Sequence, residues 1–450
     1  MMKHSNIILS FLLILWVFMM DSCKKFLDAK PDKHLAVPSG LVDYQAILDW
    51  YSVINDRGVS ALTISSDDYY YDDNDFSSLS EVNQNKYLWK RKNVFRSGYD
   101  DWNNIYTIAY YANTAIENLP NISRTSANAD AWDNAMGQGY FTRANAFFQV
   151  ALAWTQAYDQ ATASKDLGIP LKLTTDFNIP SRRSTIQQTY DQIISDLKKS
   201  IRLLPVHAVH PMRPGKPAAY ALLARIYLYM REYPLAYLYA DSCLQLRNDL
   251  MDYNQIDPSP KYPIPKFNIE ELYFEYSSPI SKHEKVDSTL YSMFDNNDLR
   301  KTLFFSDNGD GSHAYRGSYA QNLPPFIGVA TDEVYLMKAE CEARLGKTSQ
   351  AMDDLNTLLI TRWKTGTFIP YTASSQQDAL SQILMERRKE LIKRQTRWMD
   401  VKRLNKEGYN ITMTRYTLGK TYTLAPNSAG YALPIPAKVI QLSGMPQNPD

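Results

Sequence analysis

The sequence predicts a mainly α-helical protein, an irregular right-handed solenoid of tetratricopeptide-like helical hairpins with long loop-rich insertions and minor β-structure. Two segments each place two alanines twelve positions apart across a turn: Ala224 with Ala236, and Ala339 with Ala351. Small residues at this spacing let the two helices of a hairpin approach closely. Apolar residues recur at helical spacing in four further stretches: 100–118, 131–158, 185–204 and 376–404.

Each alanine pair lies in a segment with the pattern of two amphipathic helices. In the segment 217–250 the helices are expected to meet at Arg231–Tyr233, and in 329–359 Gly346 supplies the turn. Prolines between the helical stretches mark their ends. The predicted hairpins therefore lie within two parts of the chain, 100–250 and 328–404.

Two poorly periodic regions interrupt the helical pattern, at about 60–99 and 251–328. Both are rich in Asp, Asn, Pro, Gly and Tyr. Loops of this length are usually functional or disordered, and their aromatic content argues against disorder. We expect them to form a ligand face. Near the C-terminus, short alternating runs in 422–436 predict a small strand or an extended segment.

The first 22 residues have the pattern of a bacterial lipoprotein signal. A polar start precedes an almost unbroken apolar run at 7–20, and Ser22 stands directly before Cys23, as at a small-residue cleavage site. The run is shorter than the ~20 residues that span a bilayer. We expect cleavage before Cys23 and lipidation of its thiol. A plain secretory signal is the alternative, favoured by Met20 and Asp21.

Charge and cysteine content limit the classes of partner and cross-link. The chain has 49 basic and 48 acidic residues and a net charge of +1, so no overall field attracts nucleic acid or an anionic membrane surface. Cys243 and Cys341 lie on apolar helical faces and are predicted to be buried thiols. A disulfide between them in an oxidising compartment is the alternative.

No motif predicts a catalytic residue, a cofactor or a metal. His207 and His210 lie among prolines without the Glu of a zinc motif. The Gly346–Thr348 run resembles the end of a phosphate-binding loop but falls in the turn of a predicted hairpin. Asp307–Gly311 has calcium-like spacing, yet Ser318 stands where the bidentate Glu belongs. A simple turn is the preferred interpretation there, and a calcium site is the alternative.

Aromatic residues of the two irregular regions are the candidate ligand-binding side chains. The chain has 32 Tyr and 8 Trp, and flat rings with a polar edge suit sugars and peptides. The acidic run 67–73 contains three consecutive tyrosines, of which at least one is expected to be exposed. The candidates are Tyr69, Tyr70, Tyr71, Trp89, Tyr315, Arg316 and Tyr319. The tryptophans expected in the core are Trp102, Trp154 and Trp398.

The stretch 376–404 is dense in charge. It is predicted to be a solvated helix face with salt bridges at helical spacing, such as Glu390 with Arg394. A nucleic-acid patch would need a net positive balance, and the predicted export signal argues against that function in any case.

An ordered set of fragments gives the chain a family resemblance. The fragments are Cys23–Asp28, Trp102–Leu119, Gly139–Phe148, Ala330–Gly346, Glu386–Leu391, Arg397–Asp400, Leu433–Pro436 and Gln447–Pro449. Together they resemble the SusD/RagB outer-membrane lipoproteins of Bacteroidetes, almost from end to end. The chain departs from the family at Ile392–Gln395, where the family often has an acidic residue and a glycine.

The resemblance implies a single SusD-like domain at 23–450, with four tetratricopeptide-like hairpins and a loop-built ligand face. It also implies a lipid-anchored protein at the cell surface that captures oligosaccharide, passes it to a SusC-type TonB-dependent transporter and performs no chemistry. Three alternatives remain open: RagB-like capture of peptides, a surface glycoside hydrolase, since carboxylates are frequent, and a structural tetratricopeptide adaptor. Neither the sugar nor the transporter follows from the sequence.

Overall fold

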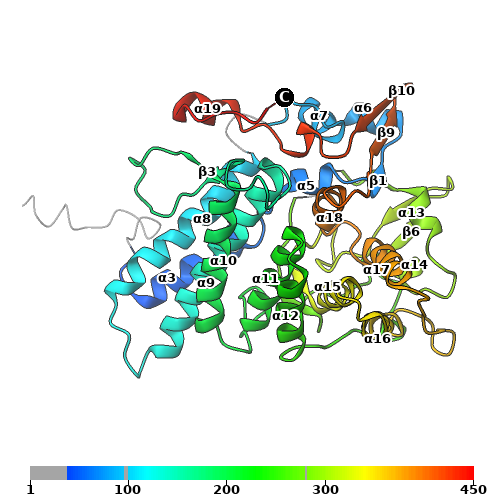
Figure 1. Ribbon diagram of the computed structural model, residues 1–450, viewed down its shortest axis with the longest axis horizontal. Coiled ribbons are helices and arrows are strands. Elements are labelled where there is room, and N and C mark those ends of the chain that lie inside the picture. The colour runs from blue at the N-terminus through cyan, green and yellow to red at the C-terminus, as the bar shows by residue number, and fades with distance from the viewer. Residues whose placement is uncertain (1–37, 96–99, 279–280, 450) are drawn as a thin grey trace, which may run out of the picture.

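Long helices form most of the molecule in the computed structural model, which describes residues 38–95, 100–278 and 281–449 (Figure 1). The mainly helical fold predicted from the sequence is confirmed. The predicted signal peptide and Cys23 lie outside the described residues. Within the described part of the chain, no helix is both long and apolar enough to cross a membrane.

The long helices pack on one another in sequence order, α8 on α9, α9 on α10, α10 on α11 and α11 on α12, before α12 meets α15 and α15 meets α16 and α17. The stack can be followed in Figure 1 from the cyan helices to the yellow and orange ones. Their bounds are α8 Asp101–Asn118, α9 Ala129–Trp154, α10 Ile186–Leu203, α11 Lys216–Met230, α12 Tyr233–Leu244, α15 Thr331–Arg344, α16 Thr348–Leu359, α17 Gln376–Glu390 and α18 Thr396–Asn405. The predicted helical stretches 100–118, 131–158 and 185–204 correspond to α8, α9 and α10.

Both predicted hairpins are present, as α11–α12 and α15–α16. The first turn begins at Arg231, whose φ of 66° ends α11 in a left-handed conformation. The second contains Gly346 at a φ of 79°, a conformation that glycine adopts at little cost. All four alanines of the two pairs are fully buried, as the close approach of the helices requires.

The predicted single helix at 376–404 is wrong, because the chain leaves the helical path between α17 and α18. Lys393 and Gln395 there have φ values of 60° and 63°, which no α-helix accommodates. This break coincides with Ile392–Gln395, where the family often carries a glycine. The chain therefore adopts left-handed backbone with residues for which it is costly.

The predicted solvated face on this stretch is also wrong. Glu386, Arg387, Lys389 and Glu390 are buried. Glu390 does not pair with Arg394: it accepts hydrogen bonds from Arg300 and Arg362, at 2.9 and 2.8 Å. Buried charges persist only when partners satisfy them, so these side chains join the scaffold to the second irregular region.

The irregular regions contain short elements. The first holds α5 Ser60–Ile64, β1 Tyr69–Tyr70, α6 Asp73–Ser78 and α7 Glu81–Tyr87, and the second holds β4 Glu271–Tyr273, β5 Lys285–Val286, α13 Ser288–Ser292, α14 Arg300–Leu303, β6 Phe305–Asp307 and β7 His313–Tyr315. Elsewhere lie α3 Leu41–Leu48, α4 Tyr51–Ile54, β2 Leu167–Pro170, β3 Arg183–Thr185, β8 Val329–Ala330, β9 Met413–Thr417, β10 Lys420–Leu424 and α19 Ala437–Ser443. The strands pair two by two, as β1–β5, β2–β3, β4–β8, β6–β7 and β9–β10. The β1–β5 pair is important for the site, because it joins the two irregular regions.

The remaining core predictions can be compared directly. Trp102, Trp154 and Trp398 are buried in the largest apolar cluster, as expected. Cys243 and Cys341 are buried free thiols, so the alternative of a disulfide between them is wrong. The strand or extended segment predicted within 422–436 overlaps β10 only at 422–424, and the described residues 431–436 contain no strand.

Candidate ligand face

Most of the first group of candidate residues faces inward. Tyr69 and Tyr71 are each 2% exposed and Trp89 is 8% exposed, so these rings cannot stack on a ligand in this conformation. The rings of Tyr69 and Tyr71 pack around Tyr87, with Tyr71 and Tyr87 centroids 5.2 Å apart. Burial raises the pKa of both Tyr69 and Tyr71. The expectation that at least one tyrosine of the run is exposed is confirmed by Tyr70, which is 36% exposed.

A buried arginine explains why these aromatic residues turn inward. Arg415, on β9, places its guanidinium carbon 4.0 Å from the Tyr87 ring centroid, 5.0 Å from that of Tyr69 and 5.3 Å from that of Trp89. It also donates hydrogen bonds to the carbonyls of Tyr69 and Ser66. A desolvated cation over aromatic faces contributes about 2 kcal/mol. Sequence reasoning missed this role because Arg415 lies some 340 residues from its partners.

The second group of candidates consists of Tyr315, Arg316 and Tyr319. These side chains also contact the rest of the protein more than they contact solvent. Tyr319 is 1% exposed. Arg316 uses its guanidinium to donate to the carbonyls of Pro258, Pro260 and Thr302, at 3.0, 3.2 and 2.7 Å. Tyr315 is half-buried against Phe304, and burial raises its pKa. The premise that these side chains form an open surface is therefore wrong for Tyr319 and only partly correct for Tyr315 and Arg316.

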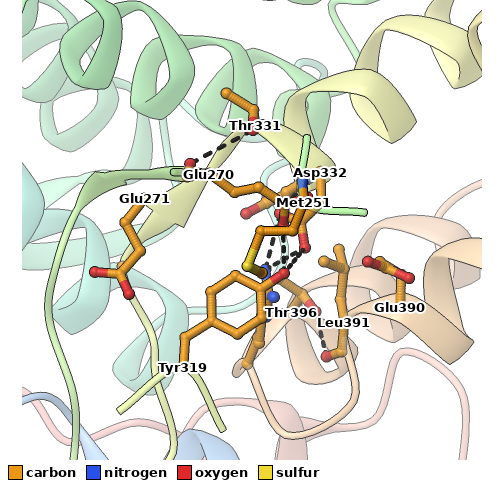
Figure 2. A network of polar contacts seen from close by, with 12 residues as sticks. Met251, Glu270, Glu271, Tyr319, Thr331, Asp332, Glu390, Leu391 and Thr396 are labelled. Carbon is orange, nitrogen blue, oxygen red and sulfur yellow. Dashed lines mark hydrogen bonds and ion pairs between the residues drawn. The ribbon is translucent and has the colours of Figure 1, made fainter. Parts of the chain in front are cut away.

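Figure 2 shows the polar network in which Tyr319 takes part. Its hydroxyl lies 2.5 Å from Glu270 and 3.2 Å from Asp332. Glu270 also accepts a hydrogen bond from Arg362 at 2.8 Å, while Asp332 accepts one from Arg394 at 2.9 Å. Asp332 belongs to α15 and Arg394 to the break before α18, so the network fixes the second irregular region to the helical stack.

A second buried junction connects the two irregular regions with the same break. Lys393 forms an ion pair with Glu284, and the Tyr71 hydroxyl donates to Glu284 at 3.1 Å. The Lys393 ammonium also lies 5.2 Å from the Tyr69 centroid and 6.0 Å from that of Tyr315. Candidates from both regions thus meet, but around Lys393, whose side chain is only 11% exposed.

Above this junction, the β1–β5 pair presents polar and aromatic side chains to solvent. Tyr70 pairs with Lys285 across the strands, so their side chains lie on the same face. The Lys285 ammonium contacts Asp72 at 3.1 Å and Asp310 at 2.9 Å. Tyr291 stacks on His313 at the start of β7, with centroids 3.5 Å apart. We call these residues the loop face: Tyr70, Asp72, Lys285, Tyr291, Asp310 and His313.

Local sequence holds the carboxylates of the loop face in place. Asp72 caps α6 by accepting a hydrogen bond from the Asp75 amide at 2.8 Å, as N-cap residues do. Asp310 lies in the turn between β6 and β7, where Gly309 and Gly311 have φ values near 80°. The run predicted to be a turn or a calcium site is thus a hairpin turn. Among the described residues, no group of three potential metal ligands occurs.

The charges of the loop face are held in their ionised forms. Hydrogen bonds from Ser312 and from Lys285 lower the pKa of Asp310, and the Asp75 amide together with Lys285 lowers that of Asp72. The two carboxylates in turn raise the pKa of Lys285. The Tyr70 hydroxyl has no hydrogen-bond partner among the described residues. A ring with a free hydroxyl beside carboxylates can stack on a flat apolar face and hydrogen-bond hydroxyl groups.

The stack of helical hairpins places the chain among the helical solenoid proteins. A family model described as "Starch-binding associating with outer membrane" matches residues 25–228, and a model of the SusD family matches residues 262–450. The chain belongs to the SusD/RagB family, a family of carbohydrate-binding proteins that associate with the outer membrane.

Individual relatives are distant in sequence. SusD-like protein P38 of Formosa agariphila is 23% identical over 257 residues, which are 52% of this chain and 45% of that protein. The alignment therefore spans less than half of this curated relative.

Solved structures share the fold. A SusD superfamily protein of Bacteroides thetaiotaomicron superposes with a TM-score of 0.73 at 20% identity, covering 92% of this chain and all of that one. A SusD-like carbohydrate-binding protein of Bacteroides vulgatus gives a TM-score of 0.66 at 19% identity, covering 90% and 97%.

Proposed function

We propose that this protein captures an oligosaccharide on the loop face and delivers it to a SusC-type TonB-dependent transporter, while a lipid on Cys23 holds it at the outer surface of the outer membrane. The single observation that carries the ligand site is the cluster around Lys285. There an exposed tyrosine, two carboxylates and a stacked aromatic pair lie together on one face. Family membership supports the choice of a carbohydrate over other ligands.

The inward-facing candidates support this proposal in a different way from the one expected. The network of Figure 2 and the Lys393–Glu284 junction anchor the segments that carry the loop face. A face supported in this way loses little conformational freedom when a ligand binds, which favours affinity. Tyr69, Tyr71, Trp89 and Tyr319 are thus proposed to position the site without contacting the ligand.

Calorimetry with the soluble mature chain tests the ligand class. Maltoheptaose is the first probe, followed by oligosaccharides of other linkages and by oligopeptides. Tyr70→Ala should weaken binding of the sugar that the wild type binds by about fivefold, because a stacked ring contributes ~1 kcal/mol. Tyr70→Phe retains the ring and should lose less.

Tyr416→Ala is the matched control, because Tyr416 is 68% exposed but lies on β9 outside the loop face. It should bind as the wild type does. Binding of peptides but of no sugar would instead support RagB-like capture, and release of shorter sugars on incubation with polysaccharide would support a hydrolase. If Tyr70→Ala and Tyr416→Ala bind equally well, the loop face is not the site.

A further inference from the structure

A row of four aromatic rings, two exposed and two half-buried, lies outside the loop face. The ring centroids of Trp50 and Tyr111 are 5.4 Å apart, those of Tyr111 and Tyr110 are 5.7 Å apart, and those of Tyr110 and Phe177 are 5.2 Å apart. Trp50 is 48% exposed and Phe177 is 79% exposed. We call these four residues the aromatic row. No candidate from the sequence belongs to it, because its members come from three separate segments.

The row is fixed by its surroundings. Tyr110 and Tyr111 lie on α8, and Trp50 precedes α4, whose first turn donates to the Trp50 carbonyl at 2.9 Å. The segment that carries Phe177 is tied to α8, because the Thr175 amide donates to Glu117 at 3.1 Å. The ring of Phe177 stacks on Tyr110 at an interplanar angle of 23°. Phe177 is therefore exposed in a conformation that these contacts fix.

The polar edges of the row are unpaired. The indole N–H of Trp50 and the hydroxyls of Tyr110 and Tyr111 have no hydrogen-bond partner within the part of the chain that the structure describes. Contiguous apolar surface that is open to solvent is typical of interaction sites. Free donors along its length suit a ligand that alternates apolar faces with hydroxyl groups, as a chain of sugar rings does. All four residues also fall within 25–228, the range matched by the starch-binding family model.

We propose that the aromatic row is a second carbohydrate-binding surface, which holds a further part of a polysaccharide whose end occupies the loop face. The inference rests on the proposed function, because it requires that the protein binds glycan. In Figure 1, α3 and α8 lie on one side of the molecule, and β1, α13 and β6 lie on the other. Two separate surfaces on one polymer chain would increase its overall affinity through effective concentration.

Affinity electrophoresis and calorimetry with the double variant Trp50→Ala/Phe177→Ala test this proposal. The polymer is the polysaccharide that corresponds to the oligosaccharide bound in calorimetry, beginning with amylose. The variant should retain the loop-face affinity for the heptasaccharide but bind the polymer about tenfold more weakly, equal to ~1.4 kcal/mol. Ile369→Ala is the matched control, because Ile369 is 78% exposed and lies outside both surfaces.

The outcomes separate this proposal from the proposed function. If the wild type binds no glycan, both fail. If the wild type binds glycan and the double variant binds the polymer equally well, only the aromatic row is excluded. If the double variant loses co-purification with the outer-membrane transporter while glycan binding is unchanged, the row is a protein interface and this proposal is overturned. Circular dichroism and thermal melting of the variant exclude loss of fold as the cause.

Discussion

At the scale of single residues, several buried polar side chains determine where the aromatic ones lie. Arg415 donates a hydrogen bond to the Tyr69 carbonyl, and its guanidinium lies over the Tyr69 ring. These contacts keep the ring of Tyr69 turned inward.

Glu275 carries a buried carboxyl group close to β4. It accepts hydrogen bonds from Gln149 and Asn145, at 2.8 and 2.7 Å. Among the described residues, no cation forms a salt bridge with Glu275. Burial raises its pKa to about 7.

Glu275→Gln should therefore change how stability depends on pH. An unfolded Glu loses its proton near its ordinary pKa, whereas the buried one keeps it to about pH 7. The folded state of the wild type is thus most stable at a pH below the pKa that Glu275 has in the unfolded chain. It loses stability as the pH rises through 7. In chemical denaturation at pH 8, the free energy of unfolding of the variant should exceed that of the wild type by up to ~3 kcal/mol. At pH 5 the two free energies should differ little.

Asp353→Asn on the exposed side of α16 serves as the control and should change little at either pH. An equal effect of Glu275→Gln at both pH values would show that Glu275 is ionised throughout.

At the scale of elements, the β9–β10 hairpin places an unfavourable residue in its turn. Leu418 and Gly419 have φ values of 51° and 69°, as in a two-residue turn with both central residues left-handed. Gly419 suits this conformation, whereas Leu418 does not. The Leu418 side chain is 53% exposed and contributes little burial. The amide of Leu418 donates to Asp73 at 2.7 Å, and any substitution other than proline preserves this bond.

Leu418→Asn should raise the free energy of unfolding by about 1 kcal/mol, because Asn tolerates the left-handed conformation. Urea titration is the measurement. Leu442→Asn, at a residue that is 74% exposed within α19, is the matched control and should give no gain. A loss of stability in Leu418→Asn would mean that the leucine packs on a neighbour.

Element prediction succeeded where local spacing determines the structure and failed where distant contacts do. The alanine pairs and Gly346 were sufficient to predict both hairpins. The charged stretch was misassigned because Arg300 and Arg362, which satisfy Glu390, lie in other segments. The run of three tyrosines was sufficient to predict that at least one of them is exposed. It did not predict which one, because that depends on the distant Arg415. No local sequence pattern predicted the aromatic row, because its residues come from three separate segments.

At the scale of the whole molecule, the helical stack carries two irregular regions that meet through β1 and β5. The family fold was predictable because its ordered fragments run along most of the chain. The proposed loop face lies in the two predicted irregular regions, but Tyr70 alone of the seven candidate residues belongs to it, since burial there depends on Arg415 and the network of Figure 2.

The proposed anchor gives a prediction at this scale. Cys23→Ala should abolish incorporation of alkynyl palmitate and release the protein from the outer-membrane fraction, because two or more acyl chains are needed for stable attachment. Ser22→Ala retains a small residue before the cysteine and is the control, which should be labelled as the wild type is. Equal labelling of Cys23→Ala would exclude lipidation at this residue.

The central claim is that the loop face is the surface that binds sugar. Hydrogen–deuterium exchange with and without the oligosaccharide identified by calorimetry tests this claim most directly. We expect slower exchange in 69–73, 285–291 and 308–313, with the interior of α11 and α15 unchanged. Protection that appears only with peptides, or only outside these three segments, would contradict it.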